Sequence, residues 1–206
     1  DENILINVDE SLSDDTVTIN RKTGFGNMFT VNSGGRLTAQ GVVMDGRTTE
    51  ELVQGKTEGL VGSSYSLIVC NGTLNLDDVT VRYVVRTGNG GALYAGENSI
   101  VTINGAIFSD NQVTGQAAAL YIDKAAEVTC TDAQFLNNKS TTPNNGGAVY
   151  CAGKFTDNYS QYIGNEAKNG GAVFVNNASA VVTLTGTDTR KGLFKDNKSS
   201  DSSAKG

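Results

Sequence analysis

Gly90-Gly91-Ala92-Leu93-Tyr94 is the first of four related stretches that return at near-regular intervals along the chain. The three later copies are Ala117-Ala118-Ala119-Leu120-Tyr121, Gly146-Gly147-Ala148-Val149-Tyr150 and Gly170-Gly171-Ala172-Val173-Phe174. The copies begin at residues 90, 117, 146 and 170, so the period is 24 to 29 residues. Self-similarity at such a period indicates a repeat architecture in which each unit stacks on the next.

A second marker keeps step with the first and consists of an aromatic residue followed three positions later by asparagine. Its four copies run from Phe108 to Asn111, Phe135 to Asn138, Tyr162 to Asn165 and Phe194 to Asn197. A third run of alternating residues, such as Val101-Thr102-Ile103, lies between the two markers. Two weaker periods precede these four, at residues 28–44 and 67–81.

Each period therefore contains three short segments in which apolar and polar residues alternate, which is typical of half-buried strands. No segment has the length or the 3.6-residue period of a crossover helix. Strands this short can bury an apolar face only by stacking on the next period. The sequence predicts an all-β fold: a right-handed single-stranded parallel β-helix, or solenoid, with about six coils of three short strands.

Residues 25–206 are expected to form the β-helix repeats, and residues 1–24 an N-terminal cap or lead-in strands. The sequence stops at Ser203-Ala204-Lys205-Gly206, where earlier periods begin another Gly-Gly-Ala strand. An open end of a β-helix exposes unpaired backbone groups. We therefore expect the coils to continue beyond the C-terminus, or to stack there on another copy head to tail, a contact that builds filaments.

Alternation with a period of two also predicts which side chains face inward. The first inward column is Phe29, Ile68, Leu93, Leu120, Val149 and Val173, the second is Val31, Cys70, Ala95, Ile122, Cys151 and Val175, and the third is Phe108, Phe135, Tyr162 and Phe194. Cys70 and Cys151 share a column but lie three coils apart, and Cys130 belongs to another strand. A disulfide needs Cα atoms within about 7 Å, so all three thiols are expected to be free and buried.

The asparagine of the second marker has an architectural explanation. Asparagine suits tight corners, and its amide can both donate to and accept from the backbone or the asparagine one coil away. We interpret these residues as a structural ladder: Asn111, Asn138, Asn165 and Asn197.

The outward side of the first strand carries a row of aromatic residues, which is the candidate binding site of this chain. Its members are Tyr94, Tyr121, Tyr150 and Phe174. Aromatic rows on a soluble rod can stack against sugar rings or partner side chains. The alternative is that the row only stabilises neighbouring strands, or is covered by the long loops at 45–66, 139–145 and 186–193.

Composition excludes several other classes of function. The formal charge of −6 and the pI near 4.6 disfavour nucleic acid as a partner. No stretch approaches the roughly 20 apolar residues of a membrane span, so no membrane insertion is expected in this segment. We expect no metal and no cofactor, because isolated pairs such as Asp110-Asn111 fit turns better than calcium sites.

Catalysis has few candidate residues. They are Asp77 and Asp78, which should alternate in and out, Asp45 at a turn, and Arg82 with Arg86 nearby. The chain has no histidine, the commonest general base. We therefore assign no catalytic residue and expect a protein that is not an enzyme. A polysaccharide lyase or glycosidase, or a carbohydrate-binding β-helix, is the alternative.

The paired motifs Gly-Gly-Ala-(Leu/Val) and Phe-x-x-Asn resemble the repeats of the chlamydial polymorphic outer membrane protein family. The resemblance covers residues 90–206, with Ala117-Ala118 replacing Gly-Gly and Tyr162 replacing Phe. Residues 1–89 are similar to large repetitive surface proteins of Gram-positive bacteria with pectate-lyase-like β-helices. Both resemblances imply secretion, extracellular display on a cell surface and adhesion to a glycan or protein of a host or neighbouring cell.

Overall fold

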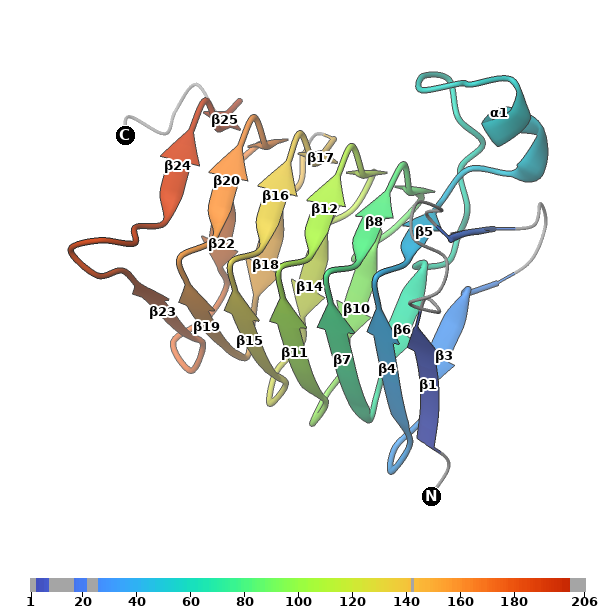
Figure 1. Ribbon diagram of the computed structural model, residues 1–206. Helices are drawn as coiled ribbons and strands as arrows, with labels where there is room; N and C mark the ends of the chain where they lie inside the picture. The colour runs from blue at the N-terminus through green and yellow to red at the C-terminus, as the bar shows by residue number, and fades with distance from the viewer. Residues whose placement is uncertain (1–2, 8–16, 22–25, 142, 201–206) are drawn as a thin grey trace.

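The computed structural model describes residues 3–7, 17–21, 26–141 and 143–200. The chain winds into a parallel β-solenoid of six stacked coils, in which equivalent strands of successive coils lie side by side (Figure 1). This confirms the predicted fold class. Strands β1 and β25, near the two ends of the described chain, lie at opposite ends of the stack.

Four parallel sheets run along the solenoid, numbered here in the order in which one coil visits them. Sheet 1 contains β3 (Phe29–Val31), β6 (Ile68–Cys70), β10 (Leu93–Ala95), β14 (Leu120–Ile122), β18 (Val149–Cys151) and β22 (Val173–Val175). Sheet 2 contains β1 (Asn3–Asn7), β4 (Arg36–Gln40), β7 (Thr73–Asp77), β11 (Ile100–Asn104), β15 (Glu127–Thr131), β19 (Lys154–Asn158) and β23 (Val181–Thr185).

Sheet 3 contains β2 (Thr18–Asn20), β5 (Val43–Asp45), β8 (Thr80–Arg82), β12 (Ile107–Ser109), β16 (Gln134–Leu136), β20 (Gln161–Ile163) and β24 (Leu193–Lys195). Sheet 4 contains β9 (Val85–Arg86), β13 (Gln112–Val113), β17 (Lys139–Ser140), β21 (Glu166–Ala167) and β25 (Lys198–Ser199). Sheet 4 was not predicted. Its two-residue strands are too short to show an alternating pattern in the sequence.

The expectation for residues 1–24 falls partly outside the described residues. In the described part, β1 pairs in parallel with β4 and β2 pairs with β5. These two strands therefore extend sheets 2 and 3 at the N-terminal end of the stack.

The register places equivalent residues of successive coils directly above one another. Leu93 pairs with Ile68 on one side and with Leu120 on the other, and Ala95 pairs with Cys70 and Ile122. The interior members of both columns are buried, which confirms the predicted inward faces. Cys70, Cys130 and Cys151 are buried free thiols, as expected.

The third column is a stack of rings inside the solenoid. Phe108 and Phe135 have ring centroids 5.4 Å apart, and Phe135 and Tyr162 have centroids 4.8 Å apart. All three side chains are fully buried. Tyr162 also stacks on Phe194 at 4.5 Å. The column predicted from the Phe-x-x-Asn marker is therefore confirmed as core.

The repeated Gly-Gly-Ala stretch follows from crowding at one corner. Gly90, Gly146 and Gly170 all have positive φ angles, of 68°, 73° and 59°. A Cβ atom on Gly90 would lie 2.9 Å from Cβ of Tyr121, so the aromatic side chain of the next coil already fills that space. Ala117 adopts the same conformation, with φ 58°, and carries the strain that a side chain has there.

The first loop after sheet 3 is a long insertion, residues 46–66, which contains the one helix of the described chain, α1 (Thr49–Val53). Figure 1 shows α1 standing out from the stack of coils near its N-terminal end. The insertion begins at Gly46, where a Cβ atom would lie 2.6 Å from the carbonyl oxygen of Tyr83. The insertion therefore starts at a point where the backbones of two successive coils are in close contact.

Replacing Phe135 with alanine should lower the free energy of unfolding by about 3–5 kcal/mol, because the change leaves a cavity between two stacked rings. Urea denaturation followed by circular dichroism measures this loss. Thr129→Ala is the matched control, because Thr129 is exposed on β15 of the same coil and its loss should cost under about 0.5 kcal/mol. A neutral Phe135→Ala would mean that the side chain does not face inward and that the register is shifted.

Candidate functional site

The four aromatic residues proposed as a binding row do form a continuous stack on the outer side of sheet 1. The rings of Tyr94 and Tyr121 are 4.9 Å apart and nearly parallel, with an interplanar angle of 7°. Tyr121 and Tyr150 repeat this geometry at 4.9 Å and 8°. Phe174 continues the row at 5.6 Å and 20°. We call these four residues the aromatic row.

The aromatic row lies against the solenoid and does not project freely into solvent. Tyr150 is only 5% exposed, and the other three rings are half-buried. Tyr121, Tyr150 and Phe174 pack with Ala117 and Ala152 in a small apolar cluster outside the main core. The row therefore lies on the outward side, as predicted, but much of each ring is covered by the solenoid.

The hydroxyl groups give this row a polar margin. The hydroxyl of Tyr94 donates a hydrogen bond of 2.7 Å to Oδ2 of Asp123. Burial, together with this carboxylate, raises the pKa of Tyr94 well above its usual value. Burial and the neighbouring Tyr150 raise the pKa of Tyr121 to about 12. Both phenols are therefore neutral at physiological pH and remain hydrogen-bond donors.

The asparagine ladder consists of Asn111, Asn138, Asn165 and Asn197, and the first three are fully buried. Each amide nitrogen donates to Oδ1 of the asparagine one coil further on, at 2.9, 3.0 and 2.8 Å along the ladder. The same nitrogens also donate to backbone carbonyl groups, for example from Asn138 to Phe108 at 2.9 Å. These bonds use both amide hydrogens, so the buried ladder has no donor left for a ligand.

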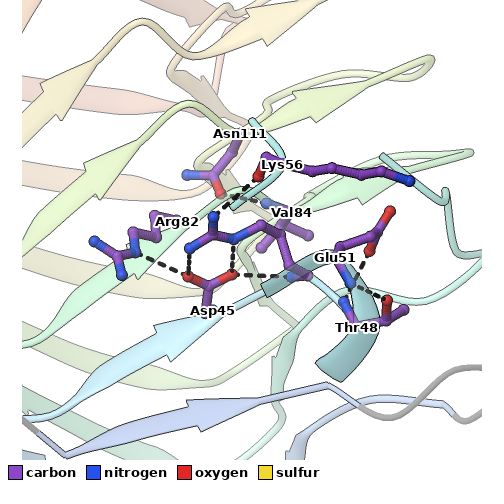
Figure 2. A network of polar contacts seen from close by, with 8 residues as sticks. Asp45, Thr48, Glu51, Lys56, Arg82, Val84 and Asn111 are labelled. Atoms are coloured by element: carbon purple, nitrogen blue, oxygen red, sulfur yellow. Dashed lines mark hydrogen bonds and ion pairs between the residues drawn. The ribbon is translucent and has the colours of Figure 1, made fainter. Parts of the chain in front are cut away.

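A buried ionic cluster holds the base of the insertion, and sequence reasoning did not foresee it. Figure 2 shows the guanidinium group of Arg82 beside the carboxylate of Asp45. Arg47 forms a second ion pair with the same carboxylate. Nε and Nη2 of Arg47 donate to its two oxygens at 2.8 and 2.6 Å, and Nε of Arg82 donates at 2.9 Å. Nη1 of Arg47 also donates to the carbonyl of Lys56, beyond α1, at 2.9 Å. We call Asp45, Arg47 and Arg82 the Asp45 clamp.

The pKa values of the clamp agree with a permanent ion pair. Burial acts to raise the pKa of Asp45, but the hydrogen bonds from Arg47 and Arg82 outweigh it and hold the pKa below its usual value. The hydrogen bonds to Asp45 also stabilise the charged form of Arg47 and raise its pKa. Its guanidinium also lies 4.3 Å from the ring centroid of Tyr83, a cation–π contact.

Glu51 holds the far side of the insertion from within α1. Its carboxylate accepts from the backbone N–H of Thr48 at 2.8 Å and from that of Val61 at 2.6 Å. The first contact completes a capping box at the helix N-terminus, because the Thr48 hydroxyl accepts from the N–H of Glu51. These hydrogen bonds overcome the effect of burial and lower the pKa of Glu51.

The structure brings together only two of the residues considered for catalysis, Asp45 and Arg82. Asp45 was expected at a turn but is buried at the end of β5, where its oxygens are already occupied. Asp77 and Asp78 were expected to alternate in and out, and this is wrong: neither is buried. Asp78 has φ 51°, so a corner in the backbone interrupts the alternation there.

Arg86 faces the corner below the aromatic row, where its Nη1 donates to the carbonyl of Gly90 at 2.9 Å. This hydrogen bond joins Arg86 to the Gly-Gly-Ala corner and not to the Asp45 clamp. Among the described residues, no three histidine, cysteine or acidic side chains gather where they could hold a metal ion. In the same part of the chain, no helix is long and apolar enough to cross a membrane.

A third buried acid, Asp157, was also not predicted from the sequence. It is 3% exposed and points into the solenoid from β19. The signal was present in the sequence, because Tyr162 replaces phenylalanine in the same coil. The hydroxyl of Tyr162 donates to Oδ2 of Asp157 at 3.0 Å.

Residues 132–152 match the model of the Chlamydia polymorphic membrane protein repeat family. The matched stretch contains Phe135 and Asn138 and ends on the Gly-Gly-Ala strand β18. This confirms the resemblance to those repeats that the two markers indicated. No curated protein and no solved structure shows significant similarity to the chain. The matched family is described as a membrane protein repeat, and that description names no enzymatic activity.

Asp45→Asn should release the insertion and lower the free energy of unfolding by about 3 kcal/mol, because it leaves two guanidinium groups without their buried counter-charge. Limited proteolysis within residues 54–62 and thermal unfolding both measure the effect. Asp78→Asn is the matched control, since that aspartate is exposed and asparagine tolerates its φ angle.

The clamp should also open in acid. The folded protein holds the pKa of Asp45 below the usual 3.8, so the stability from this group is complete above that value and is lost as the pH falls beneath it. Proteolysis of the insertion by an acid protease should therefore increase below pH 3.8. An insertion that stays resistant in strong acid would show that other contacts hold it.

Proposed function

We propose that this chain is a segment of a cell-surface, adhesin-type β-solenoid that is secreted and displayed outside the cell. Its partner is a glycan or protein on the surface of a host or neighbouring cell. The proposal is supported by the match to a polymorphic membrane protein repeat, which lies inside the regular coils. It draws on the rigid, repeated side faces that stacked coils provide for contact.

The regular stacking of the aromatic row is the observation that supports this row as the contact surface. Tyr94 and Tyr121 are parallel at 4.9 Å, and part of each ring stays accessible. Because the stacked rings cover one another's faces, the row presents ring edges and hydroxyl groups. Such a surface can pack against a sugar ring or an apolar side chain, with phenol groups beside it for hydrogen bonding. Because the rings are already ordered, binding would cost little side-chain entropy.

A polysaccharide-degrading enzyme is the second candidate and has weaker support. Most glycosidases use two carboxyl groups that face one substrate bond. The carboxylate of Asp45 is occupied by two guanidinium groups, and Asp77 accepts a hydrogen bond from Asn104 at 2.8 Å. A carbohydrate-binding solenoid without catalysis fits the aromatic row better.

Self-association through the sixth coil (β22–β25) is part of the proposal. Val175, Leu184 and Phe194 are 47%, 50% and 48% exposed there, whereas the same columns are buried in earlier coils. A further coil of the polypeptide would cover these side chains. The N-terminal coil of a second copy, stacked head to tail, would cover them in the same way.

Tyr94→Ser combined with Tyr121→Ser should abolish binding to a printed array of cell-surface glycans and to intact mammalian cells. The two changes should cost only about 1–3 kcal/mol of stability, because they remove stacking but no core residue. The control is Tyr65→Ser, since Tyr65 is 51% exposed on the insertion and outside the aromatic row. Retained binding together with a large fall in melting temperature would assign the row a purely structural role. Release of reducing or unsaturated sugar ends would support the enzyme.

Sedimentation velocity of the chain should reveal concentration-dependent association. Fusing a polar capping helix after residue 200 should suppress it, because the cap blocks strand addition to the sixth coil. A chain that stays monomeric at high concentration without a cap would rule out the head-to-tail contact.

A further inference from the structure

One coil of the solenoid carries three polar residues where its neighbours carry apolar ones. Asp157 lies in an inward column of sheet 2, paired with Cys130 on one side and Leu184 on the other. Ser160 and Tyr162 follow it at the corner and on β20. The equivalent residues of the two preceding coils are Ile103, Ala106 and Phe108, and Cys130, Ala133 and Phe135. The fifth coil (β18–β21) thus departs from the apolar pattern at three positions together.

The three polar side chains contact one another. Ser160 Oγ donates to Oδ1 of Asp157, and the Tyr162 hydroxyl donates to Oδ2 at 3.0 Å. Ser160 Oγ in turn accepts from the backbone N–H of Ala133, in the preceding coil, at 3.1 Å. Because each departure supplies a partner for another, they form one unit. We call Asp157, Ser160 and Tyr162 the Asp157 cluster.

Among the residues that the structure describes, none forms an ion pair with Asp157, although Lys191 lines the same cavity as this carboxylate. On β15 the group opposite it is the Cys130 thiol, and on β23 it is the apolar Leu184. Arg190 of the β23–β24 loop forms an ion pair with Asp132 and lies over the Tyr159 ring, 4.6 Å from its centroid. The carboxylate is therefore held by hydroxyl groups instead of a counter-charge.

A cavity of about 190 Å³ gives Asp157 a route to solvent. Asp157 lines it together with Tyr159, Leu184, Lys191 and Phe194, so the cavity lies between the fifth coil and the sixth. Both Leu184 and Phe194 belong to the sixth coil, on β23 and β24. Water that enters to solvate an ionised Asp157 would therefore separate these two strands from the coil beneath.

The pKa of Asp157 is shifted in the direction that favours its neutral form in the folded protein. Burial raises its pKa above the usual 3.8, although hydrogen bonds from Ser160 and Tyr162 oppose the shift. The folded state thus binds this proton more tightly than the unfolded state. The resulting stability is fully present below the unfolded pKa and is lost as the pH rises through the folded pKa.

We infer that the Asp157 cluster is a protonation-controlled fastening between the fifth and sixth coils, which tightens in mild acid and loosens when the carboxylate is ionised. The state of this fastening sets how firmly β23 and β24 lie on the solenoid. A surface protein with such a coil would present a firmer sixth coil in an acidic environment than at neutral pH.

Hydrogen–deuterium exchange of the intact chain tests this inference, with rates corrected for the intrinsic effect of pH. Protection of residues 181–195 should rise at least about twofold as the pH is lowered from 7.5 toward 3.8, and Asp157→Asn should remove this rise. Glu127→Gln is the matched control and should keep it, since Glu127 is an exposed acid on the neighbouring strand β15 and pairs with Lys154. An unchanged pH response in Asp157→Asn would overturn the proposal.

Two further variants separate control by protonation from simple packing. Tyr162→Phe removes a donor to the carboxylate, so the midpoint of the protection change should move to higher pH. The triple change Asp157→Leu, Ser160→Ala and Tyr162→Phe restores the apolar pattern of the other coils. That variant should fold with high protection that does not vary with pH. If it instead responds to pH as the parent does, the switch lies elsewhere.

Discussion

Parallel pairing in register between successive coils is the constraint on which the rest of this structure depends. The backbone hydrogen bonds between coils place each residue above its equivalent in the coil before. The side chain at a position in one coil therefore restricts which side chains fit at the same position in the next. The stacked rings of Phe108, Phe135 and Tyr162 and the asparagine ladder both follow from it. Similar residues recur in each column because the space available to a side chain is nearly the same in successive coils.

Departures from the repeat are possible where a coil supplies its own compensation. Asp45 lies at the end of β5 and is neutralised by Arg47, from its own insertion, and Arg82, from the next coil. Asp157 lies in an inward column, between Cys130 and Leu184, and neither of these paired residues is charged. Its partners come from the same coil, since Ser160 and Tyr162 are the nearest positions that still face inward.

The sequence sufficed for those parts of the structure that repeat. The inward columns and the pairing of Asn111 with Asn138 follow from phase alone, because alternation and period together determine the register. Sheet 4 was missed because strands such as Gln112–Val113 are too short for a pattern. The burial of Tyr150 and the hydrogen bond from Arg47 to Lys56 could not be predicted from the repeat, because they depend on the geometry of non-repeating loops. Tyr162 could have revealed the Asp157 cluster, since a single hydroxyl in a column of phenylalanines requires a buried partner.

Two of the buried acids, Asp45 and Asp157, respond to pH in opposite directions, because different groups surround them. Guanidinium groups favour the charged form of Asp45 and keep its pKa under 3.8, whereas burial without a cation favours the neutral form of Asp157 and keeps its pKa above that value. As the pH falls, Asp157 therefore takes up its proton before Asp45 does. Between the two titrations lies a pH range in which Asp45 is still ionised and the Asp157 carboxyl group is already protonated. In that range both ends of the solenoid are held in their more stable states at once.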